Sequence, residues 1–436
     1  MFKNHPPGLP YIVGNEAAER FSYYGMRSIL VVFMTTALMD ASGALRTMSE
    51  ADATFWYHMF GMANYCFPLI GAVIADAVWG KYKTIILLSL VYCAGHLALA
   101  IDDTRVGLAV GLTLIAVGSG GIKPCVSAHL GDQYRSSRSE SLSRGYTLFY
   151  LSINLGAFVS SVCTPLLLAW YGPRVAFGVP GALMAIATFI FWKGRGRYLV
   201  EPPTPWKRYL GDLAQREHRG KLVKLLVFFF ILAIFWSLFD QTGSSWIIQA
   251  ERMDRLINLP GGVSFEVLPA QVQALNPILI LLFAPLFTFG VYPFLAKRGA
   301  LTTRGKVVSG MLLAGVAFAI IAHAESLIAA GVRPSIGWQL LAYLILTIAE
   351  VVVSITSLEL AYTAAPAARR SLVTSFYLLS VSLGNGFTAL AAGPLAQYFG
   401  DPTSSRFFLL FGALSCVAAI PAWKILGGIV VNGDAV

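Results

Sequence analysis

The chain has 436 residues, of which 56% are hydrophobic and 12% are charged, and its mean hydropathy is +0.67. Soluble domains carry roughly 25% charged residues, so this composition excludes an ordinary soluble protein and indicates one that crosses a lipid bilayer many times. A formal charge of +10 suggests nucleic acid in a soluble chain, but here the basic residues lie mainly in the loops between apolar runs. We therefore expect no nucleic-acid partner.

Apolar runs of roughly 20 residues are typical of helices that span a membrane. About twelve such runs follow one another along the chain, several of them longer than the minimum. The predicted spans are residues 9–38, 51–75, 83–101, 107–130, 145–171, 175–193, 222–249, 271–296, 306–324, 336–364, 372–399 and 404–426.

The longest polar interruption, residues 194–221, divides these spans into two blocks of six. We predict an N-terminal six-helix bundle over residues 1–193, a cytoplasmic linker over 194–221 and a C-terminal six-helix bundle over 222–436. Most lysines and arginines fall in loops on the same side as the N-terminus, and the positive-inside rule then places both termini in the cytoplasm.

The first predicted span carries four charged side chains, Glu16, Glu19, Arg20 and Arg27. At about 100° per residue they project from one face of a helix. A charge at mid-bilayer costs at least a few kcal/mol, so such residues normally face a polar cavity and have a function. Ionisable groups recur in the fourth, seventh and tenth spans: Lys123, Asp240, Glu350 and Glu359.

Five segments, spread over nearly the whole chain, carry a more specific pattern. They are Glu16-x-x-Glu19-Arg20-Phe21 with Tyr23, Tyr24 and Arg27; Gly120-Gly121-x-Lys123-Pro124-Cys125; Phe149-Tyr150-x-x-x-Asn154-x-Gly156; Phe235-Trp236-x-x-Phe239-Asp240-Gln241; and Asn276-Pro277. In order and spacing these segments resemble the proton-dependent oligopeptide transporter family. The resemblance implies an all-α membrane protein with the major facilitator superfamily fold, and a proton-coupled symporter that imports di- and tripeptides by alternating access.

Residues 71–83, between the second and third spans, resemble the cytoplasmic loop signature of the major facilitator superfamily. The matching residues are Asp76, Gly80, Lys81 and Lys83. Because glycine allows close helix approach and the acid can pair in one gating state, we expect a conformational role for this loop.

A peptide zwitterion needs a cation at its carboxylate and an anion at its ammonium group. Arg27 and Lys123 suit the carboxylate, whereas Glu350, helped by the amides of Asn154 and Asn276, suits the ammonium. The expected walls of the side-chain pockets are Tyr24, Tyr65, Tyr150, Trp236 and Tyr377. Tyr377 stands where many members of the family carry tryptophan, so one pocket should differ in shape.

The resemblance also implies that Glu16, Glu19, Arg20 and Lys123 couple proton movement to transport. It implies that Arg27 and Asp240 form an outer gate pair. His58 in the second span is an expected extra proton acceptor, although a hydrogen-bonded core histidine is the alternative.

Two other residues in the spans are expected to be structural. Glu359, near the cytoplasmic end of its span, should snorkel or pair with a nearby arginine. Asn385 in the eleventh span is expected to serve packing rather than binding.

Other functions stay open as alternatives. The same fold could carry nitrate or another small metabolite, or the chain could sense peptides without moving them. Sensors usually add long cytoplasmic extensions, and the sequence after Lys424 is short. No catalytic or metal-binding spacing occurs, so we expect neither an enzyme nor a cofactor beyond the proton as coupling ion. The expected setting is the cytoplasmic membrane of a bacterium, with the lipid bilayer as environment and a monomer as the functional unit.

Overall fold

The computed structural model describes residues 5–134, 139–206, 219–258, 262, 264–297, 302–363 and 370–429. Its described residues form long helices that group into two compact units, and we describe each unit by itself. The first unit comprises Met1–Thr47 and Ala63–Gln215, and the second comprises Met48–Met62 and Arg216–Val436. Residues 207–218 of the predicted linker lie outside the described part of the chain.

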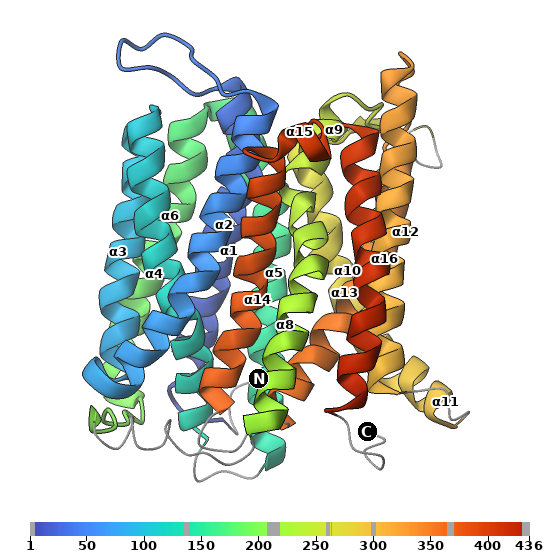
Figure 1. Cartoon of the computed structure of the whole chain (residues 1–436). Helices are drawn as coiled ribbons and strands as arrows, with labels where there is room; N and C mark the ends of the chain where they lie inside the picture. Colours follow the sequence, from blue (N-terminus) through green and yellow to red (C-terminus); the bar gives the residue numbers. More distant parts are fainter. Residues whose placement is uncertain are drawn as a thin grey trace. The chain divides into compact units, whose positions relative to one another are not determined.

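In the first unit, α3 packs against α4 and α6, and α1 packs against α5 and α6 (Figure 1). The helices are α1 (Leu9–Thr36), the second half of α2 (Glu50–Ile74), α3 (Lys81–Ile101), α4 (Arg105–Asp132), α5 (Ser139–Tyr171) and α6 (Pro173–Lys193). A π-helical turn, η1 (Ala75–Trp79), continues α2, and a 3-10 turn, η2 (Gly194–Arg197), ends α6.

In the second unit, α12 packs against α13 and α16, and α8 packs against α14 and α16. The helices are α8 (Arg219–Phe239), α9 (Ser245–Glu251), α10 (Leu275–Leu286), α11 (Tyr292–Lys297), α12 (Thr303–Ala329), α13 (Gly337–Thr363), α14 (Arg370–Ala392), α15 (Ala396–Phe399) and α16 (Ser405–Gly427). Two 3-10 segments, η3 (Asp240–Gly243) and η4 (Pro269–Ala274), and a π-helical turn, η5 (Phe287–Val291), connect them.

Three of these helices begin at a hydroxyl side chain that accepts backbone N–H bonds, which satisfies donors that have no partner within the helix. Thr104 accepts from Val106 at the start of α4, and Ser404 accepts from Phe407 at the start of α16, both at 3.2 Å. Thr302 does the same for Gly305 at the start of α12, at 3.0 Å. Polar residues directly before apolar runs thus fix where these helices begin.

Eleven helical segments of the described residues are long and apolar enough to cross a membrane. α1 is also long enough at 28 residues, but it carries the four charged side chains. The described elements therefore agree with the predicted series of about twelve spans. Two of the spans are interrupted: η3 separates α8 from α9, and η5 separates α10 from α11. A short antiparallel hairpin, β1 (Leu256–Asn258) with β2 (Ser264–Glu266), adds a small sheet to a chain expected to be all-helical.

Close packing in the first unit depends on small residues where helices meet. A Cβ atom at Gly71 would overlap the backbone of Gly121, with its Cα only 2.6 Å away. Only glycine fits such an approach, which is the usual device for bringing membrane helices into contact.

We therefore expect Gly71→Ala to destabilise the protein by about 2 kcal/mol, because the backbone of Gly121 cannot yield as a flexible side chain can. Gly14→Ala is the matched control, since a Cβ there meets no described heavy atom within 4 Å apart from its own helix backbone and chain neighbours. Thermal unfolding of the purified variants in detergent measures the difference. Equal midpoints for the two variants would contradict the close approach.

Candidate functional site

An ionic cluster lies buried on α1 within the first unit. Arg20 is 7% exposed and pairs through Nε with Glu16 Oε1 at 3.2 Å and through Nη2 with Glu19 Oε2. Ser119 on α4 donates to Glu19 Oε1 at 3.1 Å. Two acids therefore share one guanidinium inside a helix that crosses the membrane. The cluster contains two carboxylates and one guanidinium. If one carboxylate takes up a proton, the other can still pair with Arg20.

Lys123 on α4 lies next to this cluster, against aromatic rings. Its Nζ is 4.3 Å from the ring centroid of Tyr23 and 4.2 Å from that of Tyr65. Arg20 Cζ lies 5.7 Å from the same Tyr23 ring. The Tyr23 hydroxyl accepts a hydrogen bond from Asn64 at 2.9 Å, which fixes the ring. The sequence predicted Lys123 and Tyr65 at the site but assigned no role to Tyr23.

Four further predicted residues belong to the first unit. Arg27 is 9% exposed on α1, and Tyr24 makes an edge-on contact with Tyr23 at 5.3 Å. Asn154 on α5 is buried, and its amide donates to the carbonyl of Tyr150 at 3.0 Å. The ring of Tyr24 contacts the ring of Tyr23, which in turn contacts Lys123.

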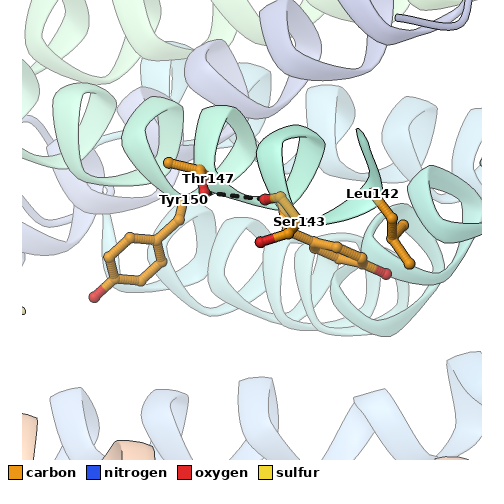
Figure 2. Close-up of a pocket in the computed structure, with 5 residues that line it drawn as sticks. Leu142, Ser143, Thr147 and Tyr150 are labelled. Atoms are coloured by element: carbon orange, nitrogen blue, oxygen red, sulfur yellow. Dashed lines mark hydrogen bonds between the residues drawn. The ribbon is translucent and has the colours of Figure 1, made fainter. Parts of the chain in front are cut away.

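Tyr150 itself is exposed and lines a cavity of about 510 Å³ along one side of α5. Figure 2 shows Tyr150 with Leu142, Ser143 and Thr147, and the dashed line marks the bond of the Thr147 hydroxyl to the Ser143 carbonyl. A tyrosine with an accessible face and a polar tip can contact a ligand side chain without a large rearrangement.

The predicted anionic group of the second unit is held by an amide. Asn276 on α10 donates to Glu350 Oε2 on α13 at 2.7 Å and to Thr347 Oγ1 at 3.3 Å. Trp236 on α8 and Tyr377 on α14 meet edge to face, with ring centroids 6.2 Å apart. The second unit thus places a carboxylate and a pair of aromatic walls on α8, α10, α13 and α14.

His58, in the first half of α2, is fully buried in the second unit. Its Nδ1 is 2.8 Å from Asn385 Oδ1, and its Nε2 is 2.8 Å from Ser244 Oγ. Asn385 also donates to Asp240 Oδ2 at 2.5 Å. The amide of Asn385 therefore joins the histidine to the aspartate. The sequence predicted a packing role for Asn385 rather than a binding role, and it did not indicate these hydrogen bonds.

We expect Asn385→Leu to destabilise the protein by about 2 kcal/mol, because it removes one hydrogen bond from each of two buried polar groups. Thr388→Val, one turn further along α14, is the matched control. Thr388 is equally buried, but its hydroxyl bonds only to the backbone carbonyls of Ser237 and Gly384. A thermal midpoint that falls no further for Asn385→Leu than for Thr388→Val would contradict this account.

The predicted conformational loop lies in the first unit. Asp76 belongs to η1, Gly80 precedes α3 with a φ of 78°, and Lys81 pairs with Asp132 Oδ2 at 2.7 Å. A positive φ favours glycine. The Asp76 carbonyl accepts from the Thr204 N–H at 2.7 Å, so the start of the predicted linker contacts this loop. Arg27 and Asp240, the expected gate pair, belong to different units, and their pairing stays a prediction.

These observations define a multi-pass helical membrane protein that buries ionic clusters within its spans. The family model described as the POT family matches residues 82–208 and 205–399, and the chain belongs to that family.

The curated relatives include peptide transporter family 1 of Drosophila melanogaster, which is 38% identical over 368 residues. That match covers 74% of this chain and 48% of the relative. Solute carrier family 15 member 2 of Homo sapiens is 38% identical over 371 residues, covering 74% of this chain and 49% of the relative. The chain thus spans about half the length of these curated relatives.

Solved structures match over nearly the full length. A crystal structure of an auto-inhibited POT family peptide transporter is 32% identical, with a TM-score of 0.85, and the match covers 99% of each chain. The POT family transporter PepTSo is 34% identical, with a TM-score of 0.84, over 97% of this chain and 98% of that one. The fold is accordingly that of the major facilitator superfamily.

Proposed function

We propose that this protein is a proton-coupled symporter that imports di- and tripeptides by alternating access. The observation that carries the proposal is the buried cluster of Glu16, Glu19 and Arg20 beside Lys123, in a chain that belongs to the POT family. Charges at such a depth are costly and are retained where they serve transport or proton relay.

The two units offer complementary chemistry for a peptide. In the first unit, Arg27 and Lys123 supply positive charge for the carboxylate, and arginine adds a bidentate fork. In the second unit, the Glu350 carboxylate supplies negative charge for the ammonium group, and Asn276 orients it through its 2.7 Å bond. Asn154 adds an amide, and aromatic faces form the side-chain pockets: Tyr24, Tyr65, Tyr150, Trp236 and Tyr377.

Proton coupling is assigned to Glu16, Glu19, Arg20 and Lys123. Protonation of one acid weakens its hold on Arg20, and the released cation can then favour another state. His58 is assigned as a further proton acceptor because it is an imidazole within a predicted span. Its ring nitrogens contact Asn385 and Ser244. Arg27 with Asp240 is assigned as the outer gate, and Asp76, Gly80 and Lys81 are assigned to the conformational loop.

The proposal extends to setting and assembly. The protein acts as a monomer in the cytoplasmic membrane of a bacterium, with both termini in the cytoplasm. It needs no cofactor apart from the coupling proton, and it catalyses no reaction. The relatives from Drosophila melanogaster and Homo sapiens are animal proteins, and the bacterial setting is part of this proposal.

The test is uptake of labelled Ala-Ala by proteoliposomes that contain the purified protein, with an inward proton gradient imposed or collapsed by an uncoupler. Accumulation above the external concentration only with the gradient supports the proposal. Folded protein that binds Ala-Ala but moves none would indicate a sensor. Protein that neither binds nor moves it would indicate another cargo, which labelled nitrate in the same vesicles then examines.

A further inference from the structure

The ring of Tyr23 faces both cations of the buried cluster. Tyr23 is completely buried, Lys123 Nζ lies 4.3 Å from its centroid, and Arg20 Cζ lies 5.7 Å away. Both distances are within the range of a cation–π contact, which is strongest where the cation is removed from water. Tyr65 supplies a second ring to Lys123 at 4.2 Å.

The surroundings hold this ring in place. The Asn64 amide donates to the Tyr23 hydroxyl, and Tyr24 packs edge-on against the ring. A buried side chain with a fixed hydroxyl has little freedom to turn away from the cations. Both contacts that fix the ring come from neutral side chains rather than from the neighbouring acids.

The charged groups around the ring come from several helices. α1 supplies Glu16, Glu19 and Arg20, and α4 supplies Lys123 together with the Ser119 hydroxyl that bonds to Glu19. Tyr92 on α3 lies near Glu19, Arg20 and Tyr23, and Tyr65 on α2 faces Lys123. When an acid of this group takes up a proton, a cation loses attraction, but the ring face does not change.

We propose that Tyr23 is a positioning residue for proton coupling, whose ring holds Arg20 and Lys123 beside the carboxylates in each protonation state. This inference rests on the proposed function. The inference goes beyond the proposed function, because the ionic residues alone would let a released cation move away. The ring supplies a second, permanent attraction that returns the cation to the same acids in the next cycle.

The experiment replaces Tyr23 with phenylalanine and with phenylalanines that carry one, two or three fluorines. Fluorine withdraws electron density from the ring face and weakens cation–π attraction with little change in size. Phenylalanine is the reference, because all members of the series lack the hydroxyl that bonds to Asn64. Gradient-driven uptake of Ala-Ala is measured across external pH, together with counterflow without a gradient.

We expect gradient-driven uptake to fall stepwise with fluorine number, to about one-tenth of the phenylalanine value with three fluorines, because the attraction weakens at each step. Counterflow measured at saturating Ala-Ala should stay within about twofold, because saturation offsets a loss of affinity at Lys123 and the series leaves ring size unchanged. A series with no trend, or counterflow that falls in step with uptake, overturns the inference. Wild-type protein without proton-driven uptake overturns the proposed function as well, whereas wild-type uptake with a flat series overturns this inference alone.

Discussion

Glu19→Gln is expected to abolish proton-driven accumulation of a dipeptide while leaving counterflow measurable. Glutamine has nearly the same shape and can still accept from Ser119, so the fold around α1 should survive. It cannot exchange a proton at the pH of the cell, and Arg20 then keeps its ion pair with Glu16. We expect the accumulation ratio to fall at least about tenfold, the equivalent of ~1.4 kcal/mol of coupling.

The measurement is uptake of labelled Ala-Ala against an imposed proton gradient, beside exchange of internal for external Ala-Ala at equal pH. Glu266→Gln is the matched control, because Glu266 lies on β2 with its side chain 59% exposed and pairs with Arg255 at the surface. That variant should accumulate peptide normally. Full accumulation by Glu19→Gln would remove Glu19 from the coupling group.

The helices of this protein could be predicted closely from the sequence because the signals are local. Span length and apolar runs predicted residues 107–130 and 404–426, and the structure has α4 at Arg105–Asp132 and α16 at Ser405–Gly427. The face shared by Glu16, Glu19 and Arg20 follows from helical geometry alone. The structure joins these three residues in one ion-pair group.

Two local features were not predicted from the sequence. The 3-10 segment Asp240–Gly243 ends α8 in a stretch with no proline, within one continuous predicted span. The hairpin between Leu256 and Glu266 has only three residues in each strand, too few for an alternating pattern to be recognised.

Among the neutral residues near the charged groups, the sequence predicted Asn154, Asn276 and five aromatic side chains, but it gave no binding or coupling role to Asn385 or Tyr23. Charges inside a span are conspicuous because of their cost, whereas Asn385 and Tyr23 look like ordinary packing residues. Their roles appear only when the partners are known: Asn385 joins His58 to Asp240, and Tyr23 contacts Arg20 and Lys123. Asn276, which donates to Glu350, was predicted from the sequence, whereas the contacts of Asn385 and Tyr23 with charged groups are found only in the structure.

Glu350→Gln is expected to raise the KM for Ala-Ala at least about tenfold, because a desolvated carboxylate that meets an ammonium group contributes ~2 kcal/mol or more to binding. The amide of glutamine keeps the size of the side chain and can still accept from Asn276. The loss should therefore reflect the charge rather than a collapse of the pocket.

A substrate that lacks the ammonium group separates these causes. Acetyl-Ala-Ala keeps the carboxylate but carries no positive charge, so wild-type protein should discriminate strongly against it and Glu350→Gln should discriminate much less. Competition with labelled Ala-Ala in proteoliposomes gives both values. Glu359→Gln, nine residues further along α13, is the matched control and should leave the preference unchanged. If Glu350→Gln kept the full preference for Ala-Ala over acetyl-Ala-Ala, the ammonium group would have to bind elsewhere, and Asp240 would be the next carboxylate of the second unit to replace.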